Sequence, residues 1–140
     1  MIIDPLRAAG AIAASGLDAQ SVRLKVVAEN MANAQSTGAT PGADPYQRKT
    51  VIFASEFDRL LGAPTVSVKD VAGDESAFPL DYDPGNPAAD KNGYVKMPNV
   101  NPLIEMADMR EASRSYEADL QMVKQARTMT SQMLDLLRNT

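Results

Sequence analysis

The sequence has no cysteine, no histidine and no tryptophan. Without cysteine and histidine, it lacks thiol nucleophiles, disulfides, Cys/His metal sites and Ser-His-Asp triads. It also has no Gly-rich phosphate loop after a strand and no G-x-S-x-G motif. An enzyme would have to rely on carboxylates, and no constellation of carboxylates indicates catalysis. We therefore expect no enzymatic activity.

Carboxylates gather in one loop, which contains Asp81, Asp83 and Asp90. A calcium loop of the EF-hand type needs an oxygen ligand at its fifth position and glycine at its sixth. Counted from Asp81, these positions hold Gly85 and Asn86, so the pattern fails. The sequence predicts a solvated acidic turn, and neither a metal nor another cofactor.

Strong positive charge is also missing, because 18 acidic residues outnumber 14 basic ones and the net charge is −4. The chain therefore has no basic footprint for nucleic acid. No apolar run approaches the roughly 20 residues of a membrane helix, so we expect no direct membrane insertion. The first residues resemble a signal peptide only weakly, because Asp4 and Pro5 stand where positive charge belongs. We interpret them as mature sequence and expect no cleaved leader.

Large aromatic side chains are scarce, at 5 % of the residues, whereas methionine occurs eight times. A core must then consist of Ala, Val, Leu, Ile and Met. Flexible methionines suit either such a core or a packed interface.

A long helix is predicted for the N-terminal region, residues 1–34. Asp4 and Pro5 are a good N-cap and first helical residue, and the helix should end near Asn33, after about 43 Å. Along it, mostly apolar residues follow one another by three or four positions, which is the period of a coiled-coil seam. This seam consists of Ile3, Leu6, Gly10, Ala13, Leu17, Gln20, Leu24, Val27 and Met31.

The C-terminal region, residues 99–140, repeats this pattern. Asn101 and Pro102 start the helix, and Glu105 lies in the first turn, where a negative charge suits the helix dipole. No Gly or Pro occurs in residues 103–140, so the helix should extend about 50 Å or more. Its seam consists of Met109, Ala112, Tyr116, Leu120, Val123, Ala126, Thr130, Met133 and Leu137.

Between the helices, residues 35–98 hold seven of the nine prolines and six of the eight glycines. Residues 49–55 and 65–71 read as short strands, and Asn92-Gly93 suits a tight hairpin turn into a strand over 94–97. The expected fold is mainly α: two long terminal helices form an elongated coiled-coil-like hairpin, with a small β-containing insert between them.

Two such seams are not fully buried in one small monomer, and other helices, often from other chains, satisfy narrow stripes of this kind. Self-assembly and a monomeric or dimeric helical-hairpin adaptor, which binds a partner without catalysis, both remain open on the pattern alone. If the chain assembles, we expect the subunit interface to contain Leu6, Ala13, Leu17, Leu24, Val27, Asn30, Met31, Asn33, Met109, Tyr116, Leu120, Val123, Met133 and Leu137.

Three small amides, including Asn30 and Asn33, lie close together where the first helix should end. The last four carbonyls of a helix lack partners, and amides can satisfy them. The pair can either cap its own helix or cap it and also contact a neighbouring subunit.

Longer stretches carry a family resemblance. Residues 15–37 (SGLDAQSVRLKVVAENMANAQST) and 45–53 (PYQRKTVIF) resemble the N-terminal signature of bacterial flagellar axial proteins, the rod and hook subunits. The block at 83–123, with GYVKMPNV, EM and ASRSYEA, narrows the resemblance to a proximal rod subunit. Mild departures are Asp119 and Met31, where the family often has Asn and Leu.

The resemblance implies a structural subunit of the flagellar basal-body rod, exported through the flagellar type III apparatus without a cleaved signal. Such subunits assemble helically into the shaft that crosses the periplasm and transmits motor torque. The terminal helices would form an inner tube and residues 35–98 would lie outside. Implied partners are other proximal and distal rod subunits and the adaptor to the MS ring and export gate.

Overall fold

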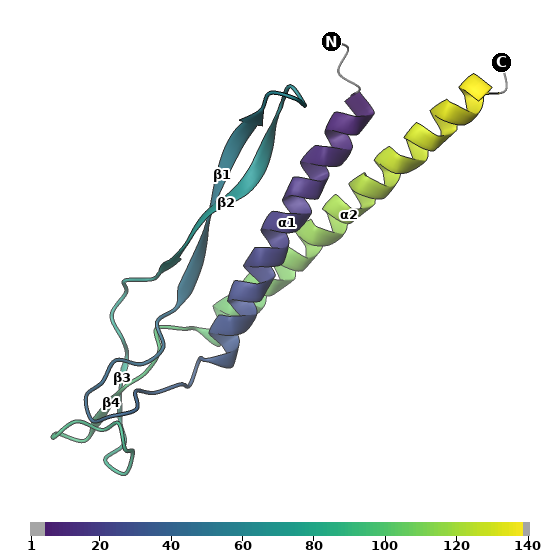
Figure 1. The fold of residues 1–140 in the computed structure, drawn as a ribbon. Coiled ribbons are helices and arrows are strands. Elements are labelled where there is room, and N and C mark those ends of the chain that lie inside the picture. The colour runs from purple at the N-terminus through teal and green to yellow at the C-terminus, as the bar shows by residue number, and fades with distance from the viewer. Residues whose placement is uncertain (1–4, 139–140) are drawn as a thin grey trace.

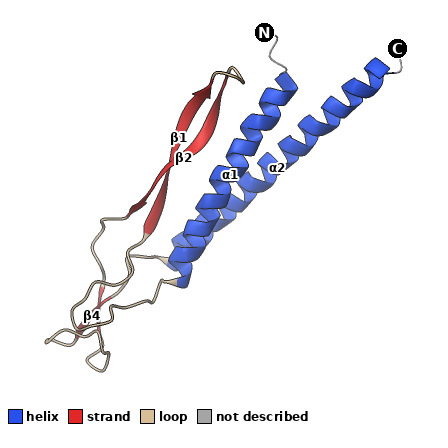
Figure 2. Ribbon diagram, in the orientation of Figure 1, coloured by secondary structure: helices blue, strands red, loops and turns tan. Residues whose placement is uncertain are grey.

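The computed structural model describes residues 5–138, which form two long helices joined by an insert with two small sheets (Figure 1, Figure 2). In chain order the elements are α1 (Pro5–Ala32), β1 (Lys49–Asp58), β2 (Ala63–Gly73), β3 (Leu80–Tyr82), β4 (Tyr94–Lys96) and α2 (Pro102–Arg138). The predicted pair of terminal helices around a β-containing insert is confirmed. Ile3 and Asp4, which the sequence places in the seam and at the helix cap, lie outside the described residues.

Local signals set the two inner helix ends. At the start of α2, Asn101 Oδ1 accepts the Leu103 N–H at 3.0 Å, as an N-cap does, and Pro102 is the first helical residue. At the end of α1, Asn33 Nδ2 donates to the carbonyl of Glu29 at 2.9 Å. The prediction that Asn33 caps its own helix is confirmed.

The two helices pack side by side and antiparallel, with small residues between them (Figure 1). A Cβ at Gly10 would lie 3.5 Å from the Cβ of Ala126, and one at Gly16 would lie 2.5 Å from Asp119 Oδ2. Near the other end of α1, Arg23 forms an ion pair with Asp108 of α2. Small side chains therefore permit a close approach of the helices, but they bury little apolar area.

The helices differ in length, with 28 residues in α1 and 37 in α2, or about 42 and 56 Å. Since Gly10 lies opposite Ala126, the last turns of α2 extend past Pro5 (Figure 1). Exposed apolar side chains occupy this end, including Met133, which is 53 % exposed, and Leu134.

The larger sheet is an antiparallel hairpin of β1 and β2 that runs along α1 (Figure 2). Its strands contain the predicted segments 49–55 and 65–71 and extend beyond them. A register shift between Ile52 and Phe53 leaves Lys69 without a partner in the ladder. The hairpin is attached to α1 by a hydrogen bond from the Val66 N–H to Ser15 Oγ at 3.1 Å.

The smaller sheet pairs β3 with β4, and it corrects one prediction. Asn92 and Gly93 precede β4, but they do not form a tight hairpin turn, because the connection between the strands spans residues 83–93. Asp90 Oδ1 accepts the N–H groups of Asn92 and Tyr94 and folds the chain into a local turn there. Gly93 adopts a φ of 86° within this turn, which explains the glycine.

Candidate assembly interface

A buried polar cluster connects the end of α1, the start of β1 and the first turn of α2. We call Asn30, Tyr46, Arg48, Lys49 and Glu105 the polar junction. Asn30 is 1 % exposed and Glu105 is 0 % exposed, and they are among the largest fully buried side chains of the described residues. Burial of these groups requires complete hydrogen bonding, since unpaired polar groups are costly in the interior.

The side-chain amide of Asn30 forms four hydrogen bonds. Its Nδ2 donates to the Lys49 carbonyl at 2.8 Å and to Glu105 Oε2 at 3.0 Å. Its Oδ1 accepts the Lys49 N–H and the Tyr46 hydroxyl, both at 2.9 Å. The prediction that Asn30 caps its own helix is therefore wrong, because these four side-chain bonds go to the insert and to α2. The amide holds an extended backbone segment against both helices.

Glu105 is balanced by Arg48, whose Nε donates to Oε1 at 2.6 Å. The Arg48 guanidinium also forms an ion pair with Asp74, with 3.2 Å between Nη1 and Oδ2, and the backbone N–H of Arg48 donates to Asn99 Oδ1. Burial lowers the pKa of Arg48, but hydrogen bonds and charge from Glu105 and Asp74 outweigh it, so the pKa is raised. The guanidinium therefore stays charged opposite the buried carboxylate.

Tyr46 and Lys49, the other two members of the polar junction, both lie near the carboxylate of Glu29. Burial and the nearby Glu29 carboxylate raise the pKa of Tyr46, which keeps its hydroxyl protonated as a donor to Asn30. Lys49 Nζ pairs with Glu29 at 2.7 Å, and this hydrogen bond raises the pKa of Lys49. Because this ion pair is exposed, we expect it to contribute little to stability.

The fourteen residues expected at a subunit interface fall into three groups in the described chain. Ala13, Val27 and Asn30 are buried within the chain itself. Met133 and Leu137 are exposed, at 53 % and 70 %. The remainder are half-buried along the helices, and these are Leu6, Leu17, Leu24, Met31, Asn33, Met109, Tyr116, Leu120 and Val123.

Other exposed apolar side chains extend this surface beyond the predicted seam. Leu103, Ile104 and Met106 are exposed at the start of α2, and Met122 and Met129 further along it. Met31, Met106 and Met109 line a hollow together with Arg110 and Arg114. An apolar surface of this extent on two narrow helices is typical of a protein that packs against others.

The acidic loop has a structural explanation. Backbone N–H groups of Tyr94 and Asn92 lower the pKa of Asp90, so its charge serves to order the turn. In the described part of the chain, no group of three or more acidic side chains is arranged to hold a metal ion. Neither α1 nor α2, as described, contains a segment long and apolar enough to cross a membrane.

Known families match both ends of the chain. A family described as "Flagella basal body rod protein" matches residues 11–40, and one described as "Flagellar basal body rod FlgEFG protein C-terminal" matches residues 91–136.

Curated relatives match nearly the whole chain. The flagellar basal-body rod protein FlgC of Agrobacterium fabrum is 61 % identical over 136 residues, which cover 97 % of this chain and 98 % of the relative. The FlgC protein of Salmonella typhimurium is 46 % identical over 127 residues, covering 89 % and 92 %. That of Borreliella burgdorferi is 37 % identical over 145 residues, covering 91 % and 94 %.

The chain belongs to the FlgC family of flagellar basal-body rod proteins. The resemblance that the sequence carries is thereby confirmed. The chain is a structural rod subunit, and not an enzyme.

The polar junction was not predicted, although one signal for it exists. Glu105 precedes Met109 by four residues. Residues four apart lie on the same face of a helix, so Glu105 shares the face of α2 that carries the apolar seam. Where such a face is buried, a charged residue on it needs a partner. The position of Glu105 in the first turn is confirmed, but its carboxylate pairs with Arg48 and Asn30.

Proposed function

We propose that this rod subunit assembles helically into the proximal rod, which crosses the periplasm and transmits motor torque. The observation that supports this most is the thin core between the helices, where small side chains meet and larger apolar ones remain outside. A lone hairpin gains little from such a core, whereas large apolar interfaces between subunits would bury the exposed side chains. A shaft under torque needs extensive interlocked contacts of this kind.

In the assembled rod, residues 1–34 and 99–140 would form the inner tube, and residues 35–98 would lie outside. Two features support this division. The β1–β2 hairpin packs along α1 and leaves much of α2 uncovered (Figure 1). The polar junction fixes the start of β1 against both helices, so the insert would keep one orientation in every copy. The seams would then continue into neighbouring helices as a coiled-coil-like packing.

The neighbours in this proposal are other proximal and distal rod subunits, further copies of this chain, and the adaptor to the MS ring and export gate. Family membership and the uncovered helix faces support this assignment. Export without a cleaved leader stays a prediction, which mass spectrometry of the subunit from purified rods would check.

Locating the subunit in basal bodies tests the proposal. We expect electron microscopy of isolated basal bodies that carry a labelled subunit to place the label in the proximal rod. We also expect purified protein to co-sediment with other rod subunits. Two results together would instead favour the helical-hairpin adaptor. These are a label outside the rod and a purified monomer or dimer that does not bind those subunits at any concentration tested.

A further inference from the structure

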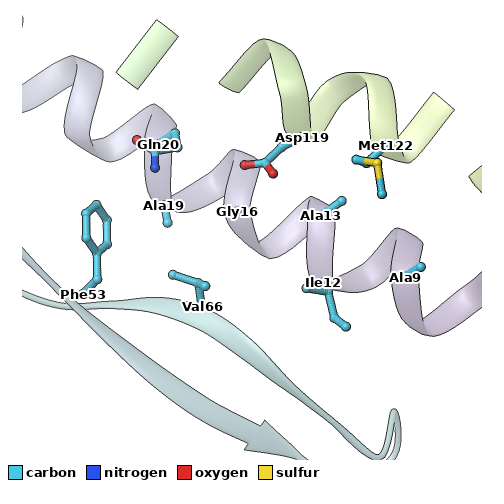
Figure 3. A pocket seen from close by; sticks show the side chains of 10 residues that line it. All are labelled: Ala9, Ile12, Ala13, Gly16, Ala19, Gln20, Phe53, Val66, Asp119 and Met122. Atoms are coloured by element: carbon cyan, nitrogen blue, oxygen red, sulfur yellow. The ribbon is translucent and has the colours of Figure 1, made fainter. Parts of the chain in front are cut away.

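A groove over Gly16 brings together α1, α2 and the β1–β2 hairpin (Figure 3). Its volume is about 520 Å³, far above the ~30 Å³ that one water molecule occupies in the liquid, so it can accept side chains. It is lined by Ala9, Ile12, Ala13, Gly16, Ala19, Gln20, Phe53, Val66, Asp119 and Met122. We call this the Gly16 groove.

Most of the residues that line the Gly16 groove are apolar. Phe53 and Val66 approach from the strands, and Met122 lies on α2 (Figure 3). Phe53 is 38 % exposed and Met122 is 56 % exposed, so both still have surface to bury. The hydrogen bond from the Val66 N–H to Ser15 Oγ holds the strand wall against α1.

Two oxygen acceptors in the groove lack donors. Asp119 projects from α2 toward Gly16, where the missing side chain leaves room for its carboxylate (Figure 3). Within residues 5–138, the half-buried Asp119 carboxylate has no hydrogen bond or ion pair. Gln20 Oε1 is buried and also lacks a hydrogen-bond partner in that range. The buried carbonyl without a donor is costly, and the half-buried carboxylate carries a charge that no described cation balances, so a cationic donor would suit both.

We propose that the Gly16 groove binds an arginine side chain carried on an apolar segment of a neighbouring rod subunit. This inference rests on the proposed function, since it requires a neighbour in the rod. Charge complementarity decides the chemistry, because Asp119 is the one charged side chain among the residues that line the groove, and no cation of the described residues pairs with it. A planar guanidinium can donate to two acceptors and also stack on an aromatic ring such as Phe53, which an ammonium does less well. The apolar residues beside the arginine would cover Val66 and Met122.

A competition experiment in cells tests the role of the charge. Tagged wild-type and variant chains are expressed at equal levels, and their ratio is measured in purified basal bodies. We expect Asp119→Asn to enter about tenfold less than wild type or worse, because loss of one partner from a desolvated charge pair is severe. Glu117→Gln removes the same charge from an exposed position on α2 and should enter equally with wild type. Circular dichroism should show unchanged helicity for both.

Photo-crosslinking identifies the occupant. A benzoylphenylalanine at Phe53 keeps an aromatic side chain in the groove, and crosslinked peptides from basal bodies are sequenced. We expect a peptide of a neighbouring subunit that contains an arginine. Asp119→Arg should abolish motility, and changing that arginine to aspartate should restore it. Equal incorporation of Asp119→Asn and wild type, or a crosslinked peptide without arginine, would overturn the proposal while the subunit is still found in the rod. Absence of the chain from basal bodies would overturn the proposed function itself.

Discussion

Asn30 and Glu105 lie 75 positions apart in the sequence and share a buried hydrogen bond, 3.0 Å from Nδ2 to Oε2. The same amide also binds the backbone N–H and carbonyl of Lys49. One side chain therefore ties the end of α1 to both β1 and α2. Because the apolar core is thin, these polar contacts decide how the insert is placed on the helices.

Asn30→Ala should destabilise the chain strongly. It would leave the half-buried Lys49 N–H and carbonyl and the buried Glu105 Oε2 without the partner that Asn30 supplies, at a total cost of about 3 kcal/mol. Asn33→Ala removes the bond to the Glu29 carbonyl at a less buried site and an exposed bond from the Ser36 hydroxyl, and it should cost about 1 kcal/mol. Urea unfolding of the purified chain measures both losses. Equal losses for the two variants would contradict the role assigned to the junction.

Arg48→Met should cost about 3 to 5 kcal/mol, because it leaves the fully buried Glu105 carboxylate without its cation. Glu105→Gln in the same chain should recover much of the loss, since it removes the unpaired charge. Arg110→Met, an exposed change on α2, is the control and should stay within about 0.5 kcal/mol of wild type. Thermal unfolding of the four proteins gives the comparison. A double variant no more stable than Arg48→Met would argue against the ion pair.

Local features of this fold were predictable, because each depends on neighbouring residues. Asn101-Pro102 marks the start of α2, Asn33 marks the end of α1, and the strand segments follow from β-branched and aromatic residues.

The partners in the polar junction were not predictable, because its contacts join residues far apart in sequence. Arg48 and Glu105 are separated by 57 positions, and no pattern in either segment indicates the other. Asn30 looked like a second helix cap, since the same amide chemistry suits both roles. The loop before β4 was misread for a related reason: the Asp90 carboxylate, and not a two-residue turn, orders Asn92 and Gly93.

Leu24→Asp and Leu120→Asp should each abolish rod assembly while the chain is still expressed. Both leucines are half-buried on the helices, and an unpaired charge in a packed seam costs several kcal/mol. Lys69→Ala changes an exposed residue of the insert and should leave swimming unaltered. Motility assays and rod purification measure the effect, and circular dichroism checks that the helices persist. Normal swimming with Leu24→Asp would refute the seam assignment.

The turn before β4 should weaken in acid. Backbone hydrogen bonds hold the pKa of Asp90 below its ordinary value of 3.8. Its stabilisation is therefore complete above that value and is lost as the pH falls through the lower, folded value. Asp90→Asn should be less stable than wild type at pH 6, and this difference should shrink toward pH 2. Hydrogen exchange of the Tyr94 backbone N–H, which donates to Asp90 Oδ1, measures how stably the turn is formed. A difference that stays constant across this range would show that the charge plays no part.

Asn33→Gly separates capping from contact between subunits. The structure confirms the cap, so the monomer should lose the bond to the Glu29 carbonyl and an exposed bond from the Ser36 hydroxyl, together about 1 kcal/mol, with nearly unchanged helicity. Glycine gains nothing from its freedom here, because no described non-glycine residue, Asn33 included, has a positive φ. If Asn33 also bonds to a neighbour, the loss repeats in every copy and the rod should break under shear or support poor swimming. Ser36→Ala, which removes only the hydroxyl that donates to Asn33 Oδ1, should behave like wild type. Equal rod strength in Asn33→Gly and wild type would mean that the amide acts as a cap alone.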